Sequence, residues 1–277
     1  MIEWTDFSVG DHRIACPSCA RKPNDKTMGV TIASDEHGVA HCFRCSHVET
    51  RQHERELTLE ERKAFARRMS ALRRQHDAEL RQRQAEAAAA AANRWAAAAQ
   101  AEEHPYLTTK GVRAHGIRIE AQHTLLIPMR DIEGRLHSVQ AIAPDGSKRF
   151  MPGGRVKGCY QAIGTPLGRV VVCEGYATGA TVQEQTGAAV AVAFNAGNLL
   201  PVAKALRFKF PGITLVIAAD DDWKTDGNPG LTAARNAARA VSGLLAVPNF
   251  GDLPRPDNAT DFNDLMRLAS AVKTGGV

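Results

Sequence analysis

The sequence predicts an α/β fold with a parallel sheet flanked by helices. Three observations in its C-terminal third support this: short apolar runs rich in β-branched residues, helix-forming segments after each of them, and acidic residues where two of the runs end. Such runs are typical of buried strands, and strand–helix alternation gives a parallel sheet with right-handed crossovers. The expected strands span 169–173, 189–194 and 213–219, and the expected helices 178–185, 199–208 and 231–244.

The acidic residues indicate a metal site. Glu174 follows the first of these strands, and Asp220 and Asp222 follow the third. Because the carboxyl ends of neighbouring parallel strands face one crevice, we expect the three side chains to converge. Carboxylates held close together repel one another unless cations neutralise them, and oxygen ligands suit Mg²⁺ or Mn²⁺. The alternative is that these acids cap helices or lie in turns.

Residues 174–179, Glu-Gly-Tyr-Ala-Thr-Gly, closely resemble the Glu-Gly-Tyr-Ala-Thr-Ala motif of plasmid- and phage-encoded DNA primases. The region therefore resembles a TOPRIM domain, the metal-binding unit that bacterial DnaG-like primases share with topoisomerases and some nucleases. Many bacterial primases carry a second acid four residues after the glutamate. Thr178 stands there in this sequence, as in the Glu-Gly-Tyr-Ala-Thr-Ala class, and it leaves the number of bound metals open.

A second motif extends the resemblance. Residues 259–266, Ala-Thr-Asp-Phe-Asn-Asp-Leu-Met, are similar to a Lys-Asp-x-Asn-Asp-Leu motif near the end of primase TOPRIM units. The resemblance implies that Asp261 and Asp264 complete the catalytic set, with Asp261 slightly favoured. A helix N-cap is the alternative for Asp261. The implied catalytic residues are Glu174, Asp220, Asp222, Asp261 and Asp264.

Four cysteines near the N-terminus predict a zinc site. They form two Cys-x-x-Cys pairs, whose turns each direct two thiolates at one tetrahedral ion, with strand-like pieces at 29–32 and 38–41 between them. A segment of this size builds little core, so Zn²⁺ would supply folding energy. The alternative is four free structural thiols. The segment resembles the zinc ribbon of bacterial and phage primases, which implies that His41 and Arg44 are candidate template contacts. The expected ligands are Cys16, Cys19, Cys42 and Cys45.

A long helix is expected after the ribbon, because residues 59–103 contain good helix formers and no Gly or Pro. Its Arg-rich first half favours a solvated linker over a DNA-tracking face. Trp95 is expected to anchor its second half onto the following domain. The predicted segments are a zinc ribbon at 1–50, a helical linker at 51–103, a basic α+β subdomain at 104–166 and a TOPRIM catalytic domain at 167–277.

The basic subdomain begins with a predicted strand, turn and returning strand at 124–136. Its order of Ile-Pro-x-Arg-Asp-x-x-Gly, Lys-Arg-Phe and Gly-x-Tyr is similar to the domain that precedes TOPRIM in bacterial primases. That similarity implies that Arg130, Lys148 and Arg149 hold template and nucleoside triphosphate. Fixed cations are suited to neutralising and orienting a triphosphate. The alternative for each is an exposed hairpin residue.

Composition limits the classes of protein. A net charge of +5 and a pI near 9.0 permit a nucleic-acid partner. No apolar run approaches the roughly 18 residues that a membrane-spanning helix needs. The first residues are acidic and lack the order of a signal peptide, so a cytoplasmic location in a bacterial host cell is expected. There, paired cysteines indicate metal binding more than disulfides.

These features together predict a DNA primase for phage or plasmid replication. The enzyme, a nucleotidyltransferase, would join nucleoside triphosphates into short primers on single-stranded DNA, with structural Zn²⁺ and catalytic Mg²⁺ or Mn²⁺. The alternatives are a TOPRIM metal-dependent nuclease and a non-catalytic DNA-binding replication accessory. A topoisomerase is disfavoured, because no nucleophilic tyrosine domain accompanies the acids. No Gly-x-x-x-x-Gly-Lys-Ser/Thr loop occurs in the sequence, so a separate replicative helicase is a candidate partner.

Overall fold

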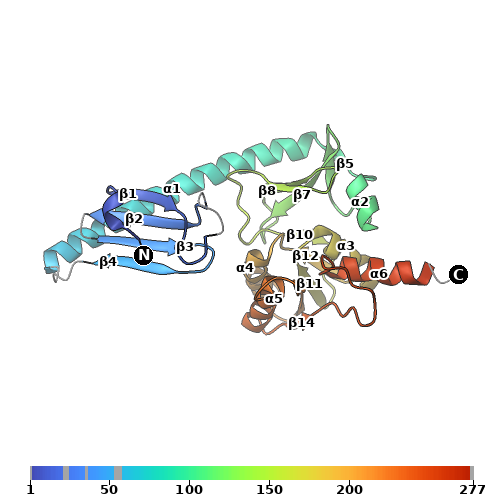
Figure 1. The fold of residues 1–277 in the computed structure, drawn as a ribbon. Helices are drawn as coiled ribbons and strands as arrows, with labels where there is room; N and C mark the ends of the chain where they lie inside the picture. Colours follow the sequence, from blue (N-terminus) through green and yellow to red (C-terminus); the bar gives the residue numbers. More distant parts are fainter. Residues whose placement is uncertain (1, 21–24, 35–36, 53–57, 275–277) are drawn as a thin grey trace. The chain divides into compact units, whose positions relative to one another are not determined.

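The computed structural model describes residues 2–20, 25–34, 37–52 and 58–274. It divides the chain into two compact units, Met1–Arg73 and Arg74–Val277 (Figure 1). The four segments predicted from the sequence are finer than these two units, and their boundaries stay predictions. Residues 53–57, which fall inside the predicted linker, lie outside the described residues.

The first unit is built on a four-stranded antiparallel sheet in the order β1-β2-β3-β4. Alternate residues of β2, Met28, Val30 and Ile32, are buried and pack with Cys16 and Cys42. This core is small, with seven buried residues among those described. Its elements are η1 (Trp4–Asp6), β1 (Gly10–Ile14), β2 (Met28–Ser34), β3 (His37–Cys42) and β4 (Val48–Gln52).

The predicted long helix is present as α1 (Leu59–Ala97), a helix of 39 residues. It ends six residues before the predicted end at 103, because the chain turns there into a short strand, β5 (Ala99–Gln100). In the second unit, Ala91 packs without exposed surface against the sheet that contains β5. Trp95 joins this contact, and the guanidinium of Arg118 lies 4.8 Å from its ring centroid. Trp95 thus anchors the helix as expected.

The second unit contains two sheets. The first is antiparallel, in the order β5-β6-β7-β8-β9, and its two faces are both covered. On β7, Leu125, Ile127 and Met129 pack toward the second sheet, whereas Leu126 packs toward α1, since side chains alternate along a strand. The remaining elements of this part are α2 (Pro105–Lys110), β6 (Arg118–Glu120), β7 (Thr124–Arg130), β8 (Leu136–Ile142) and β9 (Lys148–Phe150).

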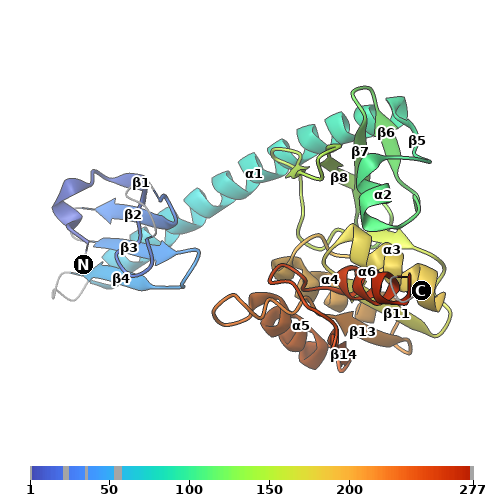
Figure 2. The same ribbon diagram turned by 45° about the vertical axis from the view of Figure 1, so that its right-hand side comes forward.

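The second sheet has the order β10-β12-β11-β13-β14, with β11 to β14 parallel and β10 antiparallel at one edge. Helices α4 and α5 cover one face, and α3 and α6 lie on the other (Figures 1 and 2). The predicted α/β fold with a parallel sheet is therefore confirmed. The elements are β10 (Gln161–Ile163), β11 (Arg169–Cys173), α3 (Tyr176–Thr186), β12 (Ala189–Val192), α4 (Ala196–Lys209), β13 (Thr214–Ala218), α5 (Pro229–Ala240), β14 (Leu244–Ala246) and α6 (Phe262–Thr274).

One helix differs from its predicted bounds, and one glycine explains how closely α3 packs on the sheet. The helix expected over 231–244 ends at Ala240, because Ser242 takes a positive φ of 48° and the chain then forms β14. Gly179, inside α3, lies where a Cβ atom would come within 2.7 Å of Val192 on β12. A residue larger than glycine would therefore push α3, and the motif that begins it, away from the sheet.

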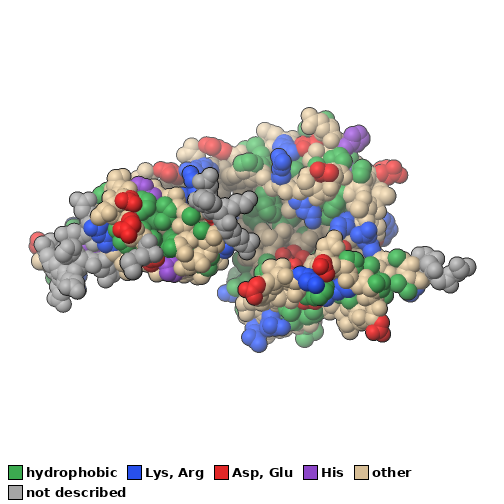
Figure 3. Space-filling model, viewed as in Figure 1, with side chains coloured by type: hydrophobic (Ala, Val, Ile, Leu, Met, Phe, Trp, Pro, Cys, Tyr) green, Lys and Arg blue, Asp and Glu red, His purple; other side chains and the backbone are tan. Residues whose placement is uncertain are grey.

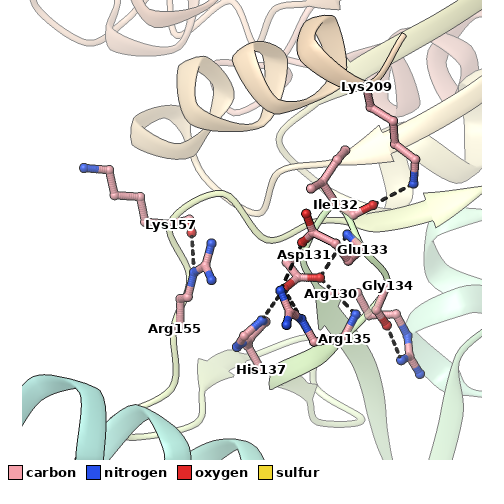
Figure 4. A network of polar contacts seen from close by, with 10 residues as sticks. All are labelled: Arg130, Asp131, Ile132, Glu133, Gly134, Arg135, His137, Arg155, Lys157 and Lys209. Carbon is pink, nitrogen blue, oxygen red and sulfur yellow. Dashed lines mark hydrogen bonds and ion pairs between the residues drawn. The ribbon is translucent and has the colours of Figure 1, made fainter.

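The turn between β7 and β8 is fixed by one buried carboxylate, Asp131, which is 3% exposed (Figure 4). Its Oδ1 accepts hydrogen bonds from the backbone N–H groups of Glu133 (3.1 Å) and Arg135 (2.9 Å). Its Oδ2 accepts from Arg135 Nε (3.1 Å) and His137 Nε2 (2.7 Å). Although burial opposes ionisation, these donors lower the pKa of Asp131 to about 2, with His137 contributing most.

We predict that Asp131→Asn lowers stability at neutral pH, on the order of 1–2 kcal/mol, because it weakens hydrogen bonds to a buried charge. A carboxyl whose folded pKa is depressed stabilises the protein above its unfolded pKa of about 3.9, and this contribution disappears as the pH falls toward the folded pKa. The melting-temperature difference between wild type and variant should therefore shrink below about pH 4. Glu133→Gln, at an exposed position of the same turn, is the control, and equal melting curves at neutral pH would refute the prediction.

Candidate functional site

The carboxyl edge of the parallel sheet carries the acids that the sequence singled out. Glu174 directly follows β11, and α3 begins two residues later. Its carbonyl accepts a hydrogen bond from Phe194 N (2.8 Å), and its carboxylate accepts one from the backbone N–H of Ala196, the first residue of α4. Phe194 has a positive φ of 74°, which is rare for a bulky residue and costs about 1–3 kcal/mol. Backbone strain is therefore located beside Glu174.

Two buried carboxylate oxygens at this edge have no hydrogen-bond partner among the residues that the structure describes. They are Oε1 of Glu174 and Oδ1 of Asp220, which comes two residues after β13. Unpaired buried polar atoms are rare, because each carries a desolvation cost that nothing offsets. A hard divalent cation is a suitable partner for such oxygens. The residues present thus fit a metal ion.

Electrostatics at these two acids agree with this assignment. The pKa of Glu174 is raised to about 7, first by burial and then by the charge of Asp222, with Asp261 adding to the effect. Burial also raises the pKa of Asp220, to about 8, and Glu174 is the largest charge acting on it. Lys148 acts in the opposite direction on Asp220. The charges of these carboxyl groups therefore act on one another, in line with the expected convergence of their side chains.

Asp222 is held by the start of α5. Its Oδ2 accepts a hydrogen bond from Gly230 N (3.0 Å), where the positive end of the helix dipole favours a negative charge. Its backbone N–H donates to Oδ1 of Asn228, the N-cap residue (2.9 Å). At Gly230 a Cβ atom would lie 2.6 Å from the carbonyl oxygen of Asp220, so only glycine allows this approach.

The middle acid of the run, Asp221, has a different role. Its Oδ2 pairs with Arg255 Nη1 (2.8 Å), and its carbonyl accepts from Arg255 Nη2 (2.8 Å). Its backbone N–H donates to Thr260 O (2.8 Å), and Arg255 Nε donates to Ala259 O (2.8 Å). Asp221 therefore joins the loop that carries Asp220 and Asp222 to the segment that leads to Asp261.

Asp261 lies at the N-terminus of α6, where it is engaged on both oxygens. Its Oδ1 accepts from Asp264 N (2.8 Å), which is the N-cap interaction weighed as the alternative. Its Oδ2 accepts from the hydroxyl of Thr178 (2.7 Å), a fully buried residue. Asp264 accepts from Thr260 N (3.1 Å) and lies 3.6 Å from the ammonium of Lys110. Both carboxylates therefore have structural partners. Asp264 is less available to a metal ion than Asp261, because it also pairs with a lysine.

The three basic residues expected to hold a triphosphate do not lie on one face. On β9, Lys148 pairs with Ile142, whose side chain packs toward the parallel sheet. Arg149 pairs with Ala141, which packs toward α1, so Arg149 projects to the opposite face. Arg130 likewise lies on the α1 side, with its guanidinium 5.7 Å from the ring of Trp95.

Of these three residues, Lys148 alone faces the acids. Its pKa is lowered by desolvation and then by the nearby charge of Lys110, while Asp261 and Asp220 act to raise it. Arg130 donates to Gly134 O (3.0 Å) on its own turn, as Figure 4 shows. In Figure 3 the second unit is hollowed between its two halves, and Asp or Glu side chains lie there beside Lys or Arg side chains. Of the three basic residues predicted to hold a triphosphate, one therefore lies near the acids.

The cysteine tetrad is assembled as the sequence predicted. The sulfur atoms of Cys16, Cys19, Cys42 and Cys45 all lie within 4.8 Å of one another. The Cys16–Cys45 pair is 3.7 Å apart and the Cys19–Cys42 pair 3.5 Å. Four ligands at about 2.3 Å around a tetrahedral zinc would be separated by about 3.8 Å, so the spacing fits this ion. The tetrad could therefore bind a metal.

The two candidate template contacts of this unit differ in their surroundings. The guanidinium of Arg44 pairs with Asp25 (2.5 Å) and donates to Cys19 O (3.2 Å). It therefore stabilises the first cysteine turn. His41 is exposed on β3, and its ring makes an edge contact with Phe43 at a centroid distance of 5.2 Å. Of the two, His41 is the more accessible to a ligand.

Comparison with known proteins agrees with this geometry. Residues 169–271 match the family described as Toprim domain. This match contains strands β11 to β14 of the parallel sheet and the helices between them. The chain is also similar to two proteins from Escherichia coli named DNA primase TraC, at 44% identity over 161 residues and 40% over 190 residues. These matches cover 54% and 60% of this chain but only 15% and 13% of the TraC proteins. The resemblance to plasmid-type primases with a Toprim domain is confirmed.

Among solved structures, the chain is similar to the primase fragment of the bacteriophage T7 primase-helicase protein. The TM-score is 0.43 at 14% identity, with 96% of this chain and 99% of the fragment covered. A DNA primase domain from Pseudomonas aeruginosa gives a TM-score of 0.33 at 17% identity, with 61% of this chain and 56% of that chain covered. Within the part of the chain that the structure describes, no helix is long and apolar enough to cross a bilayer.

Sequence reasoning missed several residues that shape the Toprim domain site. Thr178 was noted only as a lost ligand, yet its hydroxyl holds Asp261. Asn263, which is 1% exposed, donates to Lys110 O (2.7 Å) and Thr181 Oγ1 (2.8 Å), and thus ties α6 to α2 and α3. The only sequence signal for these roles was the position of each residue inside a motif.

We predict that metal-free protein loses stability as the pH rises from about 4 to about 8. The raised pKa values of Glu174 and Asp220 mean that the folded state binds more protons than the unfolded state in this window, so unfolding becomes easier with rising pH. Asp220→Asn should remove part of this loss and melt several degrees above wild type near pH 8. Adding Mg²⁺ should reverse the order, because it stabilises the protein that binds it.

Thermal melting from about pH 5 to 8, with and without Mg²⁺, tests this. Asp226→Asn, at an exposed acid of the same loop, is the control and should follow wild type. A wild-type melting temperature that rises across this window without metal, or an Asp220→Asn variant that is the less stable at every pH, would refute the prediction.

Proposed function

We propose that this chain is a DNA primase that joins nucleoside triphosphates into short primers on a single-stranded DNA template. One observation carries the proposal: the unpartnered buried oxygens of Glu174 and Asp220, opposite Lys148, in a Toprim domain. The 44% identity to a protein named DNA primase TraC supports it. Because the chain spans only about one seventh of that relative, the activity is a proposal for this chain itself.

Glu174, Asp220 and Asp222 would hold Mg²⁺ or Mn²⁺, with Asp261 as a further candidate. Bound there, the ions would lower the pKa of the attacking hydroxyl and neutralise the charge that develops on the phosphates. Asp264 is the weakest candidate ligand, because its carboxylate accepts a hydrogen bond from Thr260 N and pairs with Lys110.

The ammonium groups of Lys148 and Lys110 would orient the triphosphate. Lys148 acts on Asp220 and Asp261, and Lys110 lies 3.6 Å from Asp264. Fixed cations position a triphosphate for in-line attack. In the proposed step the primer 3′-hydroxyl forms a bond to the α-phosphorus and the bond to the bridging oxygen breaks. The hydroxyl proton passes to solvent and pyrophosphate leaves. Lys110 replaces Arg130 and Arg149 in this role, since those two face α1.

The first unit would bind Zn²⁺ through its four cysteines and would contact template with the exposed surface around His41. Backbone N–H groups of Arg44 and Cys45 donate to Cys42 Sγ at 3.4 and 3.5 Å. Burial raises the pKa of Cys42, but these donors lower it to about 6 overall, which favours the thiolate that zinc needs. A separate replicative helicase is a proposed partner of the whole protein.

We predict that purified protein with Mg²⁺ or Mn²⁺ converts labelled nucleoside triphosphates into short oligonucleotides on single-stranded DNA. Glu174→Gln should lower the yield on the order of 100-fold or more, because it removes a charged metal ligand without changing side-chain shape. Asp226→Asn is the control and should keep wild-type activity. Template shortening without synthesis would instead indicate a Toprim nuclease, and gel retention without either reaction a binding accessory.

We also predict that the protein contains about one zinc per chain and that Cys42→Ser lowers this content to near zero, because three ligands and a hydroxyl hold zinc poorly. Elemental analysis of the purified proteins measures the loss. Limited proteolysis should show cleavage within residues 2–52 of the variant. Cys159→Ala, at a buried cysteine outside the tetrad, is the control and should retain zinc. Equal zinc in Cys42→Ser and wild type would contradict the site.

A further inference from the structure

Trp223 occupies an unusual place in the Toprim domain. It directly follows Asp222, and its backbone N–H donates to Asp221 O (2.8 Å). Its side chain is 42% exposed although tryptophan carries a large apolar surface. A lone exposed aromatic residue needs no explanation. Trp223, however, is held in place by several ordered neighbours, and this arrangement does need an explanation.

Those neighbours form a layered stack. The guanidinium carbon of Arg255 lies 4.1 Å from the ring centroid of Phe250 and 4.9 Å from that of Trp223. Phe250 is 6% exposed, so the inner layer is buried and the outer layer, Trp223, is open to solvent. Arg255 is in turn fixed by its two bonds to Asp221. The stack is therefore rigid, and its outermost member is an aromatic ring.

We propose that Trp223 is a stacking platform for a nucleobase bound at the loop that carries Asp220 and Asp222. The inference rests on the proposed primase function and names a ligand contact of that same site. A pre-positioned ring stacks on any base at low entropic cost, and each such contact contributes substantially to binding of single strands. A planar base is the natural next layer on a stack whose inner members are already planar.

Lys224 adds the matching charge. Its ammonium lies 4.2 Å from the Trp223 ring centroid and 3.3 Å from Asp257 Oδ1. Both side chains of that ion pair are largely exposed, so the pair is weak and can exchange partners. The ammonium lies over the ring, so an incoming base would displace it, and the phosphate of the same nucleotide would then pair with Lys224. The platform and the cation are thus adjacent in sequence and in space.

Two sources could supply the base, a DNA strand or a free nucleoside triphosphate. Binding of the full-length protein to fluorescently labelled oligothymidylate, followed by anisotropy without added Mg²⁺, tests the first. Equilibrium dialysis with radiolabelled ATP and dTTP tests the second. Both measurements are independent of catalysis.

Trp223→Ala and Trp223→Leu should weaken binding of one of these ligands on the order of 10-fold or more, whereas Trp223→Phe should stay within about threefold. Leucine keeps apolar bulk without a ring, so the Leu and Phe variants separate stacking from packing. Phe208→Ala, which removes an aromatic side chain that is 87% exposed on α4, is the matched control and should bind like wild type. Thermal melting confirms that each variant is folded.

Loss confined to oligothymidylate assigns the platform to a DNA strand, and loss confined to ATP and dTTP assigns it to the incoming nucleotide. If Trp223→Leu binds both ligands as wild type does while wild type makes primers, the platform is refuted and the primase proposal stands. If Trp223→Phe loses as much as Trp223→Leu, stacking is likewise refuted. If wild type binds neither ligand and makes no primers, both proposals fail together.

Discussion

Carboxylates that repel one another lie close together at one edge of the parallel sheet, and the surrounding structure has to hold them there. Burial and proximity raise the pKa of Glu174 and Asp220, and one oxygen of each carboxyl group has no hydrogen-bond partner among the described residues. Their burial therefore has a cost in free energy. Much of the surrounding structure holds these groups in place regardless. The start of α5 holds Asp222, and the hydroxyl of Thr178 holds Asp261. A cation is what would make this arrangement favourable.

The fold was largely predictable from the sequence, because strand runs, helix formers and Cys-x-x-Cys spacing are local patterns. The acids were predictable for the same reason, since strand ends converge by topology. The basic residues were not, because Lys148 and Arg149 are neighbours in sequence but project from opposite faces of β9. That distinction required knowing which face of the antiparallel sheet packs on α1.

Residues that act through others were the hardest to predict. Asp221 lies between two candidate metal ligands, but its ion pair with Arg255 makes it a link between two loops. Thr178 looked like a missing ligand, but it supplies a neutral donor to Asp261. In both cases the partner lies more than thirty residues away in the sequence, so no local pattern contains the information.

The positive φ of Phe194 has a consequence for protein engineering. The strained residue donates its backbone N–H to Glu174, so the direction of the glutamate is set partly by a segment twenty residues downstream. Grafting residues 174–179 alone into another scaffold would transfer the amino-acid sequence of the motif without its geometry. A successful transplant would have to carry the 192–196 crossover as well, so the smallest portable piece of this site is discontinuous.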